Sequence, residues 1–160
     1  MTDDEWMSIA LEEAKVAMDF EEIPVASVLV GDGKEVTRGQ TQVRRRGSIA
    51  AHGELFAILE AKSSVYSYQE LTIYTTLEPC LMCVGACIQA GVKRIVYGMK
   101  AAPDGAAGMV QALGKSEFGV PKIQGGIREA EEVELMREFQ KRFPDSPAIP
   151  YVIDMLAVYG

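Results

Sequence analysis

The sequence contains few of the residues that most often bind metals or act as nucleophiles. Its 160 residues include three cysteines and one histidine, and all three cysteines lie in the stretch LEPCLMCVGAC, from Leu77 to Cys87. Thiols gathered in one stretch cannot cross-link distant parts of a fold, which disfavours a disulfide framework. Metal binding or catalysis is therefore the expected reason for this clustering.

The sequence also lacks long apolar runs and an excess of positive charge. No apolar run approaches the roughly 20 residues that span a bilayer. The acidic N-terminal stretch lacks the basic start and apolar core of a signal peptide, so we expect a cytoplasmic protein with no membrane association. The formal net charge is −7, which disfavours nucleic acid as a partner.

One short basic run departs from this acidic balance. Arg44, Arg45 and Arg46 are consecutive in the sequence. The run is compatible with a solvated surface loop and also with a local anion contact beside a binding site.

The length of the chain and the order of its patterns favour one α/β domain over residues 1–160. Apolar spacing predicts helices over 4–21 and 128–143, and two further helices that begin near His52 and at Glu78–Pro79, the latter ending at Gly91. Strands are predicted around the Gly31–Asp32–Gly33 turn, at 71–77, at 93–99 and, weakly, at 122–127. We expect a loop at 42–50, a loop with a short helix over 101–121, and an apolar C-terminal tail. This order predicts a three-layer α/β domain with a mixed sheet.

The single histidine and two of the cysteines form a pattern that suits zinc. His52 lies two residues before Glu54, and Pro79-Cys80-Leu81-Met82-Cys83 follows about thirty residues later. Zn²⁺ favours tetrahedral nitrogen and sulfur ligands, and three protein ligands leave a position for water, as in catalytic sites. Cysteines three positions apart share one helix face. The sequence therefore predicts that His52, Cys80 and Cys83 bind zinc while Glu54 transfers protons.

Each of these residues has a simpler explanation when it is taken alone. His52 and Glu54 are both compatible with an ordinary helix start, and Cys80 with Cys83 is compatible with a redox pair. Their joint occurrence at this spacing favours zinc. Cys87 lies one turn beyond Cys83, and we expect it to pack in the interior, because a fourth ligand would close the metal site.

These motifs resemble the cytidine deaminase superfamily, whose zinc deaminases share a His-x-Glu and Pro-Cys-x-x-Cys signature. The branch contains tRNA adenosine deaminases, guanine deaminases and fungal-type cytosine deaminases. TLEPCLMC, GACIQAGVKRIVYGMK and DGAAGMV resemble the tRNA adenosine deaminases, whereas GSIAAHGE and LMREFQKRFPDSP resemble fungal-type cytosine deaminase. The resemblance covers about residues 5–143. It implies a three-layer α/β/α cytidine deaminase-like fold with a five-stranded mixed sheet, and usually a homodimer.

The resemblance also implies roles for individual residues. Backbone N–H groups of Gly53 and Cys80 would approach the substrate, and Glu78 would lie with them in the substrate site. In these relatives an asparagine eleven residues before the histidine hydrogen-bonds the base. The equivalent position here is Thr41, so we expect this base contact to be lost or moved.

The leading functional hypothesis is a zinc-dependent hydrolytic deaminase of a free nucleobase or nucleoside, cytosine-like or guanine-like, that releases ammonia. A tRNA adenosine deaminase is favoured by DGAAGMV but disfavoured by the acidic charge and the missing asparagine. A non-catalytic zinc-stabilised binding domain is disfavoured by Glu54, which a structural site does not need. The Arg44–Arg46 loop and the C-terminal tail are the expected lids, and the tail would exclude a polymer.

Overall fold

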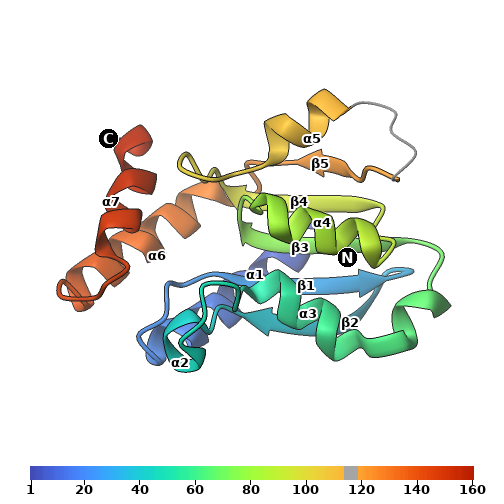
Figure 1. The fold of residues 1–160 in the computed structure, drawn as a ribbon, viewed down its shortest axis with the longest axis horizontal. Helices are drawn as coiled ribbons and strands as arrows, with labels where there is room; N and C mark the ends of the chain where they lie inside the picture. Colours follow the sequence, from blue (N-terminus) through green and yellow to red (C-terminus); the bar gives the residue numbers. More distant parts are fainter. Residues whose placement is uncertain (114–118) are drawn as a thin grey trace.

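The computed structural model describes residues 1–113 and 119–160 (Figure 1). Five strands form one sheet in the order β2-β1-β3-β4-β5. They are β1 (Ala26–Gly31), β2 (Lys34–Gln40), β3 (Leu71–Leu77), β4 (Arg94–Met99) and β5 (Lys122–Gln124). β1 pairs antiparallel with β2 and β3, whereas β3, β4 and β5 run parallel. The predicted α/β class and five-stranded mixed sheet are confirmed.

Helices cover both faces of this sheet. α1 (Asp3–Asp19), α6 (Glu129–Arg142) and α7 (Ile149–Leu156) pack in one hydrophobic core, and α3 (Gly53–Ala61), α4 (Leu81–Gln89) and α5 (Ala107–Leu113) pack in the other. The remaining described elements are the one-turn helix α2 (Val43–Arg46) and the 3₁₀ helices η1 (Lys62–Ser67) and η2 (Ala157–Tyr159). In the described parts of the chain, no helix is long and apolar enough to cross a bilayer.

The alternation of strand side chains separates the two cores. Val28 and Tyr74 belong to the core with α1 and α6, whereas their neighbours Leu29 and Ile73 belong to the core with α3 and α4. Successive side chains of a strand point to opposite faces, so a single run of apolar residues in each strand builds both cores. The strands are therefore held from both sides.

Three local expectations need correction. The segment 42–50, expected as a loop, contains helix α2, because the distant Glu22 carboxylate accepts the backbone N–H groups of Arg44 and Arg45. The C-terminal tail forms helix α7, because Val152 and Met155 are fully buried on one of its faces. The helix expected to open at Glu78–Pro79 begins at Leu81, because Cys80 has an extended backbone and acts as the N-cap.

Other boundaries agree more closely with the sequence patterns. The short helix expected within 101–121 is α5, and residues 114–118 of that segment lie outside the described residues. Gly91, the expected terminator of α4, follows the C-cap Ala90 and has a positive φ of 78°. Glycine adopts this left-handed conformation without steric cost, which ends the helix at this point.

The topology brings several element ends to one edge of the sheet. β3 ends at Leu77 and leads directly into α4, whose N-terminus faces the N-terminus of α3. Helices α6 and α7 extend beyond the strands at the same end of the molecule (Figure 1). Residues distant in the sequence therefore meet at the carboxyl end of β3.

Candidate active site

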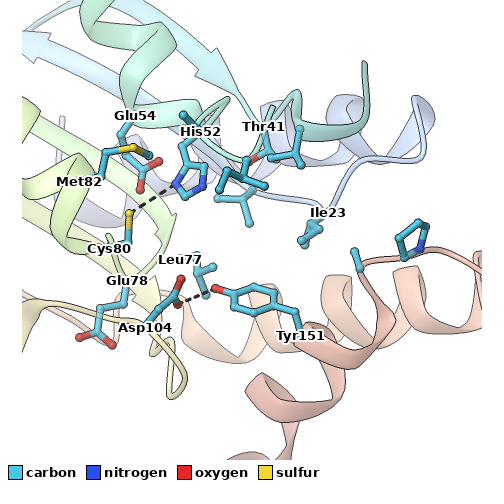
Figure 2. Close-up of a pocket in the computed structure, with 16 residues that line it drawn as sticks. Ile23, Thr41, His52, Glu54, Leu77, Glu78, Cys80, Met82, Asp104 and Tyr151 are labelled. Carbon is cyan, nitrogen blue, oxygen red and sulfur yellow. Dashed lines mark hydrogen bonds between the residues drawn. The ribbon is translucent and has the colours of Figure 1, made fainter. Parts of the chain in front are cut away.

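A cavity of about 620 Å³ opens at this edge of the sheet (Figure 2). Its apolar lining includes Ile23, Val25, Leu77 and Ala148, which come from three separate segments. Residues around α2 and residues of the C-terminal segment also line it. Both segments expected as lids therefore do border the pocket.

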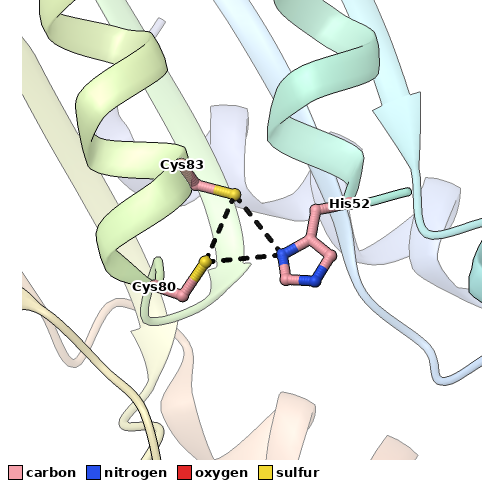
Figure 3. A group of neighbouring side chains, drawn as sticks. All are labelled: His52, Cys80 and Cys83. Carbon is pink, nitrogen blue, oxygen red and sulfur yellow. Dashed lines mark hydrogen bonds between the residues drawn. The ribbon is translucent and has the colours of Figure 1, made fainter. Parts of the chain in front are cut away.

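One wall of the pocket carries a compact group of metal-binding side chains (Figure 3). His52 Nδ1 lies 3.6 Å from the Sγ of Cys80 and 3.4 Å from the Sγ of Cys83, and the two sulfurs are 3.7 Å apart. Tetrahedral zinc with bonds of about 2.3 Å to sulfur and about 2.0 Å to nitrogen separates such ligand atoms by about 3.5–3.8 Å. The observed triangle matches these separations, so the three residues fit a zinc ion.

Helix termini hold the three ligands in place. His52 is the N-cap of α3 and Cys80 is the N-cap of α4, both with extended backbones, while Cys83 lies one turn into α4. The partial positive charge at a helix N-terminus favours a thiolate over a thiol. The strand-to-helix connection after β3 therefore supplies both the position and the charge state that a metal requires.

The hydrogen bond between the two ligand thiols shifts their pKa values in opposite directions. The pKa of Cys80 is lowered to about 4, first because the Cys83 thiol donates a hydrogen bond to it and then because of His52. The same hydrogen bond, followed by burial, raises the pKa of Cys83. A metal binds thiolates, so its binding here would release protons from the ligand thiols.

Glu54 lies beside this group in the first turn of α3. Its side chain is 3% exposed and lines the pocket, and Thr75 Oγ1 on β3 donates to its Oε1 at 3.3 Å. Burial is the largest cause of its raised pKa. A carboxyl group with a raised pKa can accept a proton and release it again near neutral pH.

The residues expected to contact the substrate differ in how they face the pocket. Thr41 is buried and lines the pocket with Cys80. Glu78 also lines the pocket, but its carboxylate accepts the backbone N–H groups of Ala101 and Ala107 at 3.0 and 3.1 Å. In Figure 2 this carboxylate points away from Glu54 and His52. Glu78 therefore braces the loop after β4, and its contact with substrate stays a prediction.

Gly53 has a structural reason to lack a side chain. A Cβ at this position would lie 2.9 Å from the carbonyl oxygen of Gly39 and 3.4 Å from Cα of Ala26. These atoms belong to β2 and β1, so the missing Cβ lets α3 pack closely against the sheet. The expected approach of the substrate to the Gly53 backbone stays a prediction.

The opposite wall of the pocket contains a polar pair that the sequence analysis did not identify. The Tyr151 hydroxyl, on α7, donates to Asp104 Oδ1 at 2.8 Å (Figure 2). Burial, followed by this hydrogen bond, raises the pKa of Tyr151. Asp104 opens the DGAAGMV motif and Tyr151 lies in the tail expected as a lid. The sequence therefore indicated both segments without indicating that they meet.

Cys87 lies apart from the metal-binding group. It is fully buried among apolar side chains of α3, α4 and the sheet. Burial raises the pKa of its thiol well above the ordinary value, so the group is neutral. Its surroundings are those of a packed hydrophobic residue, as the sequence analysis expected.

This fold and this site define a zinc-dependent deaminase. Residues 1–99 match the family model described as the cytidine and deoxycytidylate deaminase zinc-binding region, and the chain belongs to that family. That region binds zinc, and the group of His52, Cys80 and Cys83 fits this metal as the cofactor.

Several relatives are named for reactions on tRNA. The chain is 32% identical over 151 residues to a tRNA-specific adenosine deaminase of Agrobacterium fabrum, covering 88% of this chain and 96% of that protein. It is 44% identical over 98 residues to the chloroplastic tRNA(adenine(34)) deaminase of Arabidopsis thaliana, covering 60% of this chain and 8% of that protein. It also matches a tRNA(Ile)-lysidine synthase of Deinococcus radiodurans at 37% identity over 152 residues, covering 90% of this chain. The chain spans only 26% of that synthase.

Solved structures share the fold. One comes from a study of A-to-I editing by tRNA:A34 deaminases, with a TM-score of 0.71 and 29% identity, covering 82% of this chain and 98% of that chain. Another is a guanine deaminase from Nitrosomonas europaea, with a TM-score of 0.69, covering 86% of this chain and 84% of that chain. The latter is 19% identical and supports the fold alone.

These relatives correct two expectations from the sequence analysis. The expected free nucleobase or nucleoside substrate is wrong, because several relatives with substantial identity are named for adenine or adenosine in tRNA. The expectation that nucleic acid is not a partner is contradicted by the same relatives. Net charge misled the prediction because a polymer contacts a local surface and not the average of the chain.

Proposed function

We propose that this chain deaminates adenosine to inosine in tRNA, at position 34 of the anticodon. The observation that carries the proposal is the relationship to the tRNA-specific adenosine deaminase of Agrobacterium fabrum, which extends over 96% of that protein. The pocket supports it, since such enzymes take the target base out of its stack into a closed site. A cavity of about 620 Å³ with apolar walls suits one extruded nucleotide.

The reaction requires one carbon–oxygen bond to form and one carbon–nitrogen bond to break. His52, Cys80 and Cys83 would hold the zinc, which when bound supplies a Lewis acid that makes water a nucleophile at neutral pH. Water adds to C6 of adenine, and ammonia leaves from the same carbon.

Glu54 carries the protons of this exchange. Its carboxylate accepts one proton from the water and donates it to the ring nitrogen, then accepts the second proton from the added hydroxyl group and donates it to the departing amine. Burial raises the pKa of Glu54, which suits a carboxyl group that must both accept and donate protons. Thr75 Oγ1 orients the carboxylate toward the pocket by its hydrogen bond to Oε1.

An anticodon stem-loop tests the proposal. Zinc-loaded full-length chain is incubated at physiological salt with a stem-loop that carries adenosine at position 34, and inosine is measured by mass spectrometry of the digested RNA. A stem-loop with guanosine at that position and the Glu54→Gln variant are the controls. Inosine only with adenosine and intact Glu54 is expected. Absence of inosine from both this stem-loop and full tRNA would overturn the proposal.

We also propose that the chain acts as a homodimer. The outer surface of the α3, α4 and α5 layer supports this, because it exposes large apolar side chains: Leu59, Leu81, Met82, Met109 and Leu113, each at least 41% exposed. Exposed apolar surface of this kind is typical of an interface with another protein. Sedimentation of the wild type and of Leu81→Lys at micromolar concentration tests it, and a monomeric wild type would contradict it.

A further inference from the structure

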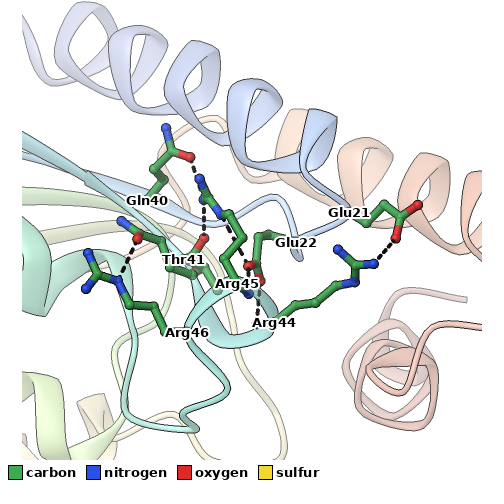
Figure 4. A network of polar contacts seen from close by, with 8 residues as sticks. Glu21, Glu22, Gln40, Thr41, Arg44, Arg45 and Arg46 are labelled. Atoms are coloured by element: carbon green, nitrogen blue, oxygen red, sulfur yellow. Dashed lines mark hydrogen bonds and ion pairs between the residues drawn. The ribbon is translucent and has the colours of Figure 1, made fainter.

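Helix α2 is fixed by a buried carboxylate at the rim of the pocket (Figure 4). Glu22 is 2% exposed and accepts hydrogen bonds from the backbone N–H groups of Arg44 and Arg45 at 3.0 and 2.8 Å. The N-terminal N–H groups of α2 are therefore already occupied by an anion. Any further anion at this helix must be bound by side chains.

The three consecutive arginine side chains have different roles. Arg45 turns inward, where it contacts Glu22, donates to Gln40 and to the carbonyl oxygen of Thr41, and is 26% exposed. Arg44 and Arg46 diverge to the two ends of the helix (Figure 4). Arg45 is thus a structural residue, and the two flanking guanidinium groups remain at the surface.

The two outward arginines have only weak attachments among the described residues. Arg44 is 58% exposed and pairs with Glu21 at 2.8 Å, and Glu21 is itself 49% exposed. Arg46 donates to Gln42 at 3.0 Å and lies over the ring of Phe56, 5.0 Å from its centroid. Exposed ion pairs of this kind contribute little to stability, so a phosphate can replace Glu21 on Arg44 at small cost.

Arg44 lies beside the mouth of the active site, and Arg46 is two residues further along the same helix. Val43 and Ile49, on either side of them in the sequence, line the pocket, and Ile49 is 88% exposed. Arg44 also lines a neighbouring hollow that shares Pro147 with the active-site pocket. A strand that delivers a nucleotide into the pocket must pass over this rim.

We propose that Arg44 and Arg46 bind backbone phosphates of the RNA strand on the two sides of the nucleotide that enters the pocket. This inference rests on the proposed tRNA substrate. Guanidinium groups form bidentate hydrogen bonds with phosphate oxygens. The net charge of −7 does not oppose these contacts, because exposed charges farther away than about 8 Å are largely screened at physiological ionic strength.

Equilibrium binding tests this surface independently of turnover. Fluorescence anisotropy of a labelled anticodon stem-loop is measured over a range of salt concentrations, with Glu54→Gln as the background so that no product forms. Arg44→Ala and Arg46→Ala are each expected to weaken binding about tenfold at low salt. Each should also reduce the slope of log K against log salt by about 0.7, the value for one phosphate contact on a single strand.

Two further variants sharpen the test. Arg38→Ala removes a 41% exposed, ion-paired arginine on β2, outside helix α2 and outside the hollow that contains Arg44. It is therefore the matched control and should change neither the affinity nor the salt slope. Glu21→Gln removes the competing carboxylate of Arg44 and should tighten binding about two- to threefold. Thermal unfolding checks that every variant is folded.

The possible failures are distinguishable. If Arg44→Ala and Arg46→Ala bind the stem-loop with the affinity and salt slope of Arg38→Ala, the phosphate contacts are disproved whatever the turnover. If the stem-loop binds with the expected slopes but the wild type forms no inosine, the phosphate surface stands and the proposed reaction fails.

Discussion

The two walls of the pocket are built in different ways. The zinc-binding wall comes from two helix starts, where His52, Glu54 and Cys80 lie within short sequence motifs. The opposing wall is assembled from α2, the loop after β4 and α7, and its parts meet only through long-range contacts such as Tyr151 to Asp104. The chemistry is therefore encoded locally, whereas the recognition of substrate depends on the whole fold.

This difference explains why the reaction was easier to predict than the substrate. A zinc ligand set requires particular side chains at particular spacings, so a motif identifies it. Recognition of an RNA substrate would depend on where charged side chains lie around the pocket mouth. The sequence alone reveals the net charge of the chain but not these positions. Arg45 points inward to Glu22, whereas Arg44 faces solvent. The sequence cannot distinguish these orientations, because the three neighbouring residues are all arginine.

On the zinc-binding wall, Glu54→Gln is expected to cause a large loss of activity while the zinc stays bound. The substitution keeps the shape of the side chain but removes the proton carrier, and such groups contribute about 10²–10⁴-fold to rate. Inosine formation under single-turnover conditions measures the loss, and metal analysis should show unchanged zinc content. Retention of most of the turnover would show that another group carries the protons.

Cys83→Ala and Cys87→Ala compare a ligand with a packed thiol on the same helix. The two sulfurs are one turn apart, but only Cys83 lies 3.4 Å from His52 Nδ1. Cys83→Ala should lose zinc and activity together. Cys87→Ala should keep about one zinc per chain and near-normal activity, with a loss of unfolding free energy of about 1 kcal/mol.

Atomic absorption and chemical denaturation of the two variants measure these effects in parallel. Loss of zinc from Cys87→Ala would mean that Cys87 is a ligand. The site would then be closed and structural, and the assignment of the water position would fail.

Tyr151→Phe tests the opposing wall. It removes the hydrogen bond to Asp104 while keeping the aromatic ring in the pocket. A hydrogen bond to a charged group contributes about 1.5–3 kcal/mol, so KM should rise by about tenfold while kcat changes less. Asp104→Asn should have a similar effect, and the double variant should be no worse than either single one. Additive losses would show that the two side chains act independently.

The sheet and the metal site were predictable because each depends on a repeating or local pattern. β-branched runs such as 71–77 specify a strand, and the spacing of Cys80 and Cys83 specifies a shared helix face. Helix α2 was not predictable, because its N–H groups are satisfied by Glu22, twenty-two residues before Arg44. The packing role of Gly53 was not predictable either, since only the folded structure places Gly39 against it.

Glu132→Gln should have the smallest effect on catalysis, because Glu132 belongs to neither wall. It lies in α6, fully buried, and neither carboxylate oxygen has a hydrogen-bond partner among the described residues. Burial raises its pKa well above the ordinary value of 4.5.

The sign of the pH effect follows from this raised pKa. The folded state holds the Glu132 proton more tightly than the unfolded state, so its contribution to stability is complete below about pH 4.5 and declines as the pH rises toward the folded-state pKa. Glu132→Gln cannot ionise and should flatten this decline, raising the free energy of unfolding at pH 8 by about 1 kcal/mol and leaving it unchanged at pH 4. Urea denaturation at the two pH values measures the difference, and kcat should change less than about twofold because the group lies outside the pocket. An equal stability change at both pH values would show that packing around Glu132, and not its proton, sets the effect.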